Sequence, residues 1–177
     1  VQSTELTPID LDNFMFKYVE ELRARKPDIN IVYESFVPYL MENIAKETYV
    51  TILGEDDLLH TLLDNLVENA DKHAFSVGED NKLEIQLFYD EDEETFGFKI
   101  SNTGRPFPKD FTERDFLSKG RKAGGAAGTG YGGWYIRQIL NKLGGEIEIV
   151  DNTIFKEEIS NGYTTSIVIE LPLISLV

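Results

Sequence analysis

The chain has 177 residues, 41 % of them hydrophobic, and its 32 acidic and 17 basic residues give a formal net charge of −15. Its length suits one domain, and its acidic surface would repel nucleic acid. The lack of cysteine excludes disulfides and thiolate sites, and no stretch approaches the ~18 apolar residues of a membrane span, so we expect this fragment to make no membrane contact.

The N-terminal third predicts one helix and two strands. Apolar residues at helical spacing predict a helix over residues 9–24, which Pro27 ends. We therefore expect residues 1–28 to form a linker and an edge helix, and residues 29–177 to form the main domain. Within that domain, Ile29–Phe36 and Glu47–Leu53 are rich in β-branched and aromatic residues, which favours strands.

A helix beginning near Gly54 carries two asparagines in an unusual place. With about 100° per residue, its apolar side chains fill one half-circle, while Asn65, Asn69 and Lys72 stack along the border. A half-buried amide without a partner costs roughly 1–3 kcal/mol. The asparagines therefore either bond to neighbouring backbone or form a ligand site, where amide oxygens suit Mg²⁺ and Lys72 suits phosphate.

The next segment predicts a hairpin followed by a long loop. Lys82–Asp90 and Thr95–Ser101 alternate apolar and polar residues around an acidic turn, so they should pair. Residues 102–128 lose all periodicity and collect glycine, proline, lysine and arginine. A loop of that length in a compact domain is usually functional or mobile.

The last segment predicts a helix over residues 132–143, followed by strands over residues 145–151 and Tyr163–Pro172. Helices and strands are therefore mixed along the chain, with consecutive strands near its end. This order predicts an α+β fold, a two-layer sandwich in which helices cover one face of a mixed sheet.

Glycines gather at the start of the 132–143 helix, in the run Gly128–Gly133. Such a run lets backbone N–H groups approach an anion at a helix N-terminus, although a flexible loop before a plain helix is the alternative. Lys119, Arg121 and Lys122 precede the run. They form a cluster of positive charge in an acidic chain, for which a solvated loop is the plain alternative to a ligand role.

Four motifs and the terminal strand resemble those of one ATPase superfamily, which includes histidine kinases, gyrase, heat-shock chaperones and MutL-type ATPases. Asn65–Ala74 (NLVENADKHA) resembles the N box of the histidine-kinase branch, and Asn102–Pro108 (NTGRPFP) resembles the first glycine box, usually Asp-x-Gly-x-Gly. Phe116–Gly120 resembles the F box, Gly128–Gly132 (GTGYG) the second glycine box, and the terminal TTSIVIELP the closing strand. The chain is therefore similar to the catalytic, ATP-binding domain of a sensor histidine kinase.

The resemblance implies a Bergerat-type fold over residues 29–177, with ATP held between the asparagine-bearing helix and a mobile lid over residues 105–128. It implies that Asn69 holds Mg²⁺, that Lys72 contacts phosphate, and that Asn65 has a structural or water-mediated metal role rather than a catalytic one. The implied nucleotide site consists of Asn65, Asn69, Lys72, His73, Asn102, Gly104, Lys119, Arg121, Lys122, Gly128, Thr129, Gly130, Tyr131, Gly132 and Thr165.

The implied activity is transfer of the γ-phosphoryl group of Mg-ATP to a histidine on a separate helical hairpin, in two-component signalling with a response regulator. Neither His60 nor His73 has the sequence context of that acceptor. Two alternatives stay open, a non-catalytic nucleotide-binding module and an anti-sigma-type serine kinase. We expect a cytoplasmic domain that is monomeric when isolated, and the cytoplasmic part of a membrane-bound sensor is one form that the full-length protein could take.

Asn102 departs from the family pattern, which has aspartate there. A carboxylate only accepts hydrogen bonds, whereas an amide can turn and also donate. The resemblance implies that this side chain faces the amino group of adenine, where guanine has a carbonyl, so an amide that can donate would discriminate less between the two bases. We therefore predict that the chain prefers ATP over GTP by a smaller margin than an Asn102→Asp variant would.

Overall fold

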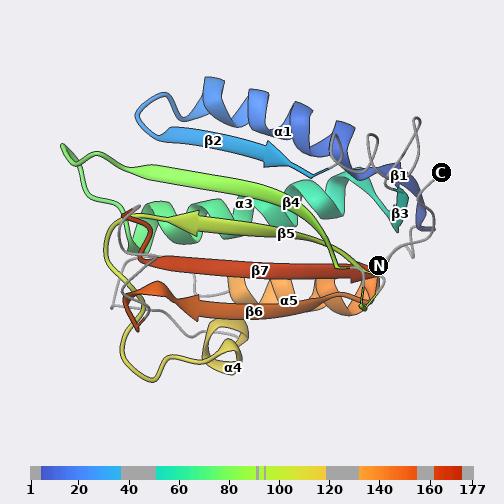
Figure 1. Ribbon diagram of the computed structural model, residues 1–177. Helices are drawn as coiled ribbons and strands as arrows, with labels where there is room; N and C mark the ends of the chain where they lie inside the picture. The colour runs from blue at the N-terminus through green and yellow to red at the C-terminus, as the bar shows by residue number, and fades with distance from the viewer. Residues whose placement is uncertain are drawn as a thin grey trace.

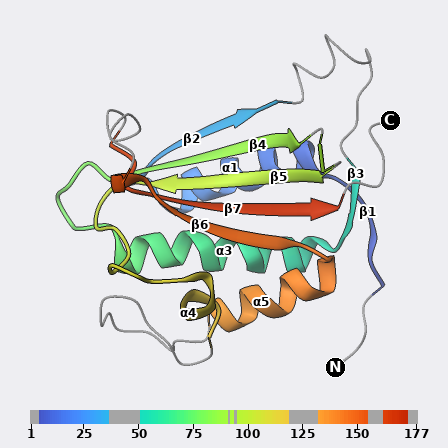
Figure 2. The same ribbon diagram turned by 60° about the horizontal axis from the view of Figure 1, so that its bottom comes forward.

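Helices cover one face of a five-stranded sheet in the computed structural model (Figures 1 and 2), which describes residues 5–36, 51–90, 92–93, 95–118, 132–154 and 162–172. The elements in chain order are β1 (Thr7–Asp10), α1 (Leu11–Arg25), β2 (Asn30–Ser35), β3 (Thr51–Gly54), α3 (Asp56–His73), β4 (Lys82–Asp90), β5 (Thr95–Asn102), α4 (Glu113–Leu117), α5 (Gly132–Leu143), β6 (Glu146–Asp151), a 3-10 turn (Asn152–Ile154) and β7 (Thr165–Pro172).

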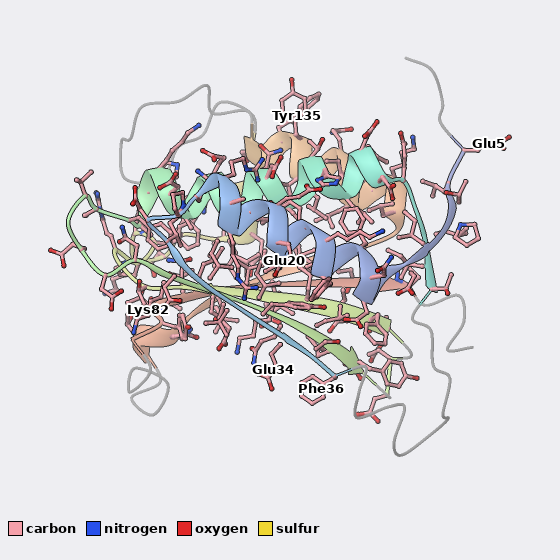
Figure 3. The ribbon with its side chains drawn as sticks, turned by 90° about the horizontal axis from the view of Figure 1, so that it is seen from above. Glu5, Glu20, Glu34, Phe36, Lys82 and Tyr135 are labelled. Atoms are coloured by element: carbon pink, nitrogen blue, oxygen red, sulfur yellow. The ribbon has the colours of Figure 1, made fainter. Side chains whose placement is uncertain are left out.

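The main sheet has the strand order β2-β4-β5-β7-β6. Strand β2 runs parallel to β4, and the other neighbouring pairs are antiparallel. Side chains alternate between the faces, so Leu83, Ile85 and Leu87 of β4 are buried toward the helices while Glu84 and Gln86 lie on the other face. The helix layer and the sheet layer are seen edge-on in Figure 3. This confirms the predicted α+β sandwich with a mixed sheet.

One hydrophobic core joins the two layers. The apolar stripe predicted for α3 faces the sheet, and its buried residues are Leu59, Leu62, Leu63, Leu66, Val67 and Ala70. Helices α1 and α5 add their own buried stripes to the same core. Because each fully buried aliphatic side chain contributes about 1.5–3 kcal/mol, this packing fixes which side of α3 is left for other contacts.

The N-terminal segment differs from its prediction. Ile9 belongs to β1, which pairs with β3 in a separate two-stranded sheet, so the helix begins at Leu11 and not at residue 9. The reason is a cap, because the Asp10 carboxylate accepts a hydrogen bond from the backbone N–H of Asn13 at 3.1 Å. Residues 47–50 of the predicted second strand lie outside the described residues, and the domain boundary at residue 28 stays a prediction.

The predicted loop over residues 102–128 contains a short helix, α4, that periodicity could not reveal. Thr112 and Asp115 form a capping box at its start, and Phe116 is its buried residue. Glu113 ties α4 to the edge of the sheet, because its carboxylate accepts a hydrogen bond from the Ile149 N–H at 2.9 Å. The rest of the predicted lid, residues 119–128, lies outside the described residues. Over the described part of the chain, no helix is long and apolar enough to cross a membrane.

Polar contacts join α1 to α3 on the side away from α5. The Tyr18 hydroxyl donates a hydrogen bond to Asp64 at 2.7 Å, and Arg25 forms an ion pair with the same oxygen at 2.8 Å. Burial alone would raise the pKa of Asp64, but the hydrogen bonds from Arg25 and Tyr18 outweigh it and hold that pKa below its ordinary value. Asp64 therefore stabilises the fold in its charged form.

An Asp64→Asn variant should lose stability at neutral pH. Because the Asp64 side chain is 39 % exposed, screening limits the loss in the free energy of unfolding to about 1 kcal/mol at pH 7. A lowered native pKa stabilises above the unfolded value, so the difference from wild type should shrink as the pH falls below 3.8 through the native pKa. Urea titrations at pH 7 and pH 3, with exposed Glu21→Gln as the control, measure this difference, and a loss that does not change with pH would contradict it.

Candidate functional site

Asn65 joins α3 to the first turn of α5. Its amide nitrogen donates a hydrogen bond to the Thr61 backbone carbonyl at 2.7 Å, one turn earlier in the helix. Its amide oxygen lies 3.0 Å from the position that a Cβ atom at Gly132 would occupy. The structure thus brings the first asparagine of the N box beside the last glycine of the second glycine box, and it gives Asn65 a backbone partner.

Asn69, Lys72 and His73 continue the same border of α3. Asn69 and His73 are half-buried and Lys72 is exposed. Within the part of the chain that the structure describes, the Asn69 amide has no hydrogen-bond partner and Lys72 has no ion pair. A half-buried amide oxygen and an unpaired lysine one turn on form a donor set that fits a hard cation and its phosphates.

The end of β5 supplies a second part of the site. Asn102 and Thr165 are opposite one another in the β5–β7 register, and both are buried. The Asn102 amide nitrogen donates a hydrogen bond to the Thr103 carbonyl at 2.9 Å. Because a carbonyl can only accept, this bond fixes the amide with its nitrogen toward Thr103 and leaves its oxygen as the acceptor.

Gly104 connects this strand end to the end of α3. Its φ of +98° lies in the region that favours glycine, and a Cβ there would be 2.2 Å from the Ala74 carbonyl oxygen. Arg105 donates its backbone N–H to the same Ala74 oxygen at 3.0 Å. Thr164, which the sequence analysis missed, donates its hydroxyl to the Gly104 carbonyl at 2.9 Å, so β7 holds the other side of the loop.

Helices α4 and α5 meet at Gly133, the last glycine of the run, which the sequence analysis did not include among the site residues. A Cβ at Gly133 would lie 1.7 Å from the Phe116 carbonyl oxygen, so only glycine allows this approach. Figure 2 shows α4 beside the N-terminal end of α5. The residues on either side of the gap in the described chain, Ser118 and Gly132, therefore lie close together. The predicted site residues between them, Lys119, Arg121, Lys122, Gly128, Thr129, Gly130 and Tyr131, lie outside the described residues.

Two further observations bear on where a metal ion or an anion could bind. Among the described residues, no group of three or more histidine, cysteine or acidic side chains could hold a metal ion, and the predicted metal ligands are amides instead. A hollow on the sheet is lined by Glu146, Glu148, Val168 and Glu170. Its acidic lining opposes phosphate binding there.

The comparisons with known proteins agree with this geometry. A family model described as the histidine kinase-, DNA gyrase B- and HSP90-like ATPases matches residues 54–175, and domains of this family bind ATP. The chain belongs to this family. The matched segment of this chain includes the described site residues, from Asn65 on α3 to Thr165 on β7. No curated protein sequence matches the chain significantly.

Solved structures of histidine kinases share the fold of this ATPase domain. The mycobacterial sensor histidine kinase MprB is 18 % identical, with a TM-score of 0.72, over 96 % of this chain and 99 % of that chain. The catalytic domain of the histidine kinase ThkA is 20 % identical, with a TM-score of 0.66, over 96 % and 98 %. The ATP-binding domain of PrrB from Mycobacterium tuberculosis is 15 % identical, with a TM-score of 0.66, over 97 % and 100 %. At these identities the likeness confirms the Bergerat-type fold.

Gly104→Ala should destabilise the protein through a backbone clash. The positive φ costs about 1–2 kcal/mol for alanine, and the approach to the Ala74 carbonyl raises the expected loss in the free energy of unfolding to about 2–4 kcal/mol. Gly78→Ala is a matched control, because Gly78 has a φ of +83° and nothing within 4 Å of the added Cβ. Denaturant unfolding of both variants measures the difference, and equal losses would show that the Ala74 contact has no effect.

The fixed Asn102 amide changes the expectation for base selection. If its oxygen already acts as the acceptor, Asn102→Asp should change the ATP to GTP affinity ratio by less than about threefold, well below the tenfold effect of ~1.4 kcal/mol. The smaller margin predicted from the sequence required the amide to turn, which would break its bond to Thr103. Competition binding of ATP and GTP on both proteins gives the ratio, and a tenfold rise in the variant would show that the amide does turn.

Proposed function

We propose that this ATPase-family domain binds Mg-ATP and transfers the γ-phosphoryl group to a histidine on a separate phosphoacceptor hairpin, as part of a two-component sensor kinase. The observation that carries the proposal is Asn65. In the ATP-hydrolysing branches this position has a glutamate that takes a proton from water, and an amide cannot do so. The Asn65 amide is also bonded to the Thr61 carbonyl, which supports a role in structure and not in water activation.

The described side chains would contact three parts of Mg-ATP, namely the metal ion, the phosphates and the base. Asn69 would provide an amide oxygen to Mg²⁺, with Asn65 nearby for a water-mediated contact, and Lys72 would contact phosphate. The ion would neutralise charge on the phosphates. Asn102 and Thr165 would lie toward the base, with Gly104 holding the loop and His73 at the end of α3. Gly132 places the N-terminus of α5, whose partial positive charge favours anions, beside Asn65.

The residues outside the described ranges complete the proposed site. Lys119, Arg121 and Lys122 would close over the triphosphate, and backbone N–H groups of Gly128, Thr129, Gly130 and Tyr131 would approach it.

The acceptor histidine is proposed to lie outside residues 1–177. His60 packs between the rings of Phe14 and Tyr18, with centroid distances of 5.1 and 5.5 Å. His73 is half-buried at the end of α3. In the transfer the bond from the γ-phosphorus to its bridging oxygen breaks, a bond to the acceptor imidazole nitrogen forms, and ADP leaves. Both histidines are half-buried on α3, which supports an acceptor on another segment.

Partners and place in the cell follow from the proposed activity. The hairpin would supply the histidine and the dimer contacts, a response regulator would receive the phosphoryl group, and the isolated domain would be a monomer. Because ATP and response regulators are cytoplasmic, the domain would act in the cytoplasm. Two other functions share the same pocket, a nucleotide-binding module without transfer and an anti-sigma-type serine kinase.

The test combines binding and transfer. The chain is incubated with Mg-ATP labelled at the γ-phosphate and with a histidine-bearing helical hairpin as a separate polypeptide. We expect Mg-ATP binding and an acid-labile, base-stable label on the hairpin, with none on His60 or His73. Asn69→Ala should weaken Mg-ATP binding by about 1–3 kcal/mol, the cost of losing a contact with a charged ligand, and should reduce labelling accordingly.

Asn81→Ala is the matched control, because the Asn81 side chain bonds within its own loop, to the Ser76 backbone. It should bind and label as the wild type does. Failure of the wild type to bind Mg-ATP would overturn the proposal. Binding without label would indicate the nucleotide-binding module, and an acid-stable label on a serine would indicate the serine kinase.

A further inference from the structure

Helix α3 carries more negative than positive charge, which opposes the binding of a triphosphate. Between Asp56 and His73 it carries five acidic residues and a single lysine, Lys72, in a chain of net charge −15. Glu68 directly precedes the proposed ligand Asn69, and Asp71 directly precedes Lys72. Two uncompensated carboxylates at these positions would repel the phosphates that the site is proposed to bind.

Two basic residues at the C-terminal end of α1, Arg25 and the C-cap residue Lys26, offset part of this negative charge. The Lys26 ammonium lies 2.7 Å from Asp71 and 2.8 Å from Glu68, so one cation bridges both carboxylates. The Lys26 side chain is only 17 % exposed, which protects the bridge from solvent. Arg25 pairs in the same way with Asp64, the next acidic residue toward the helix start. Helix α1 lies along the helix layer beside α3 in Figure 3.

The bridge also decides what Lys72 can do. Glu68 and Lys72 are four residues apart on one helix, the spacing at which a glutamate pairs well with a following lysine. Glu68 instead pairs with Lys26, and Lys72 has no ion pair with any described residue. Occupation of Glu68 by Lys26 therefore leaves Lys72 available for an anion.

We propose that Lys26 is a positioning residue for triphosphate binding, which partly offsets the negative charge of Glu68 and Asp71 and keeps Glu68 away from Lys72. The inference rests on the proposed function, because it concerns the same nucleotide site. Lys26 does not touch the nucleotide and acts through α3. Burial alone would lower the pKa of Lys26, but its hydrogen bonds with Asp71 and Glu68 outweigh burial and raise that pKa, so the bridge is charged at neutral pH.

The test compares two ligands that differ in their phosphates. Lys26→Met should weaken Mg-ATP binding about five- to tenfold, because Glu68 and Asp71 lose the positive charge that partly offsets them and Glu68 can then pair with Lys72. Binding of adenosine, which has no phosphate, should change by less than about twofold. Titration calorimetry gives the Mg-ATP affinity of the full chain, and NMR titration gives that of adenosine.

Two companion variants separate the charge effect from loss of structure. Lys26→Arg should keep Mg-ATP affinity within about twofold of wild type. Combining Lys26→Met with Glu68→Gln and Asp71→Asn should restore the affinity to a similar level, because no carboxylate is left uncompensated. Arg23→Gln is the control on the same helix, since Arg23 pairs with Glu20 and the Ile31 carbonyl and not with α3, and it should leave Mg-ATP affinity unchanged.

Each outcome is decisive for Lys26. The inference is overturned if Lys26→Met binds Mg-ATP as wild type does, if it weakens both ligands equally, or if the triple variant is not restored. Should Lys26→Met fail to fold, Lys26→Gln is measured against the same thresholds. A wild type that binds no Mg-ATP would instead overturn the proposed function, so the two failures are distinguishable.

Discussion

The packing of α3 against the sheet is the contact on which the rest of the structure depends. Its apolar stripe enters the core formed with the inner faces of β4, β5 and β7. Because a helix that buries one stripe cannot rotate without exposing it, the other two stripes are fixed as well. One carries Asp64, Glu68 and Asp71 toward α1, and the other carries Asn65, Asn69 and Lys72 along the α5 side.

Close backbone approaches then assemble the site around this helix. Gly132 admits the Asn65 amide, Gly133 admits the Phe116 carbonyl, and Gly104 admits the Ala74 carbonyl. At each place a side chain would occupy the space that another segment needs. The glycines therefore define the positions of α5, α4 and the loop after β5 relative to α3, and they matter for packing as well as for contact with an anion.

Charge is arranged to suit a ligand that the whole chain would otherwise repel. The pairs of Arg25 and Lys26 with three carboxylates offset most of the negative charge on the outer stripe of α3, and they place both cations at the C-terminal end of α1, where a helix favours positive charge. Such partly exposed pairs contribute little to stability one by one. Their larger consequence is for the electrostatic potential at the neighbouring stripe, where phosphate is proposed to bind.

The sequence by itself determined the elements whose patterns are local. Alternation predicted the β4–β5 hairpin, helical spacing predicted α3 and α5, and the motif of Asn65, Asn69 and Lys72 indicated the ATPase family. Only the tertiary structure decided the pairing of β1 with β3, the helix α4, the orientation of the Asn102 amide and the bridge from Lys26 to Glu68 and Asp71. The physical reason is distance along the chain. A periodic pattern records which side of one element is buried, whereas caps, amide orientations and ion pairs depend on which partner arrives from another part of the fold.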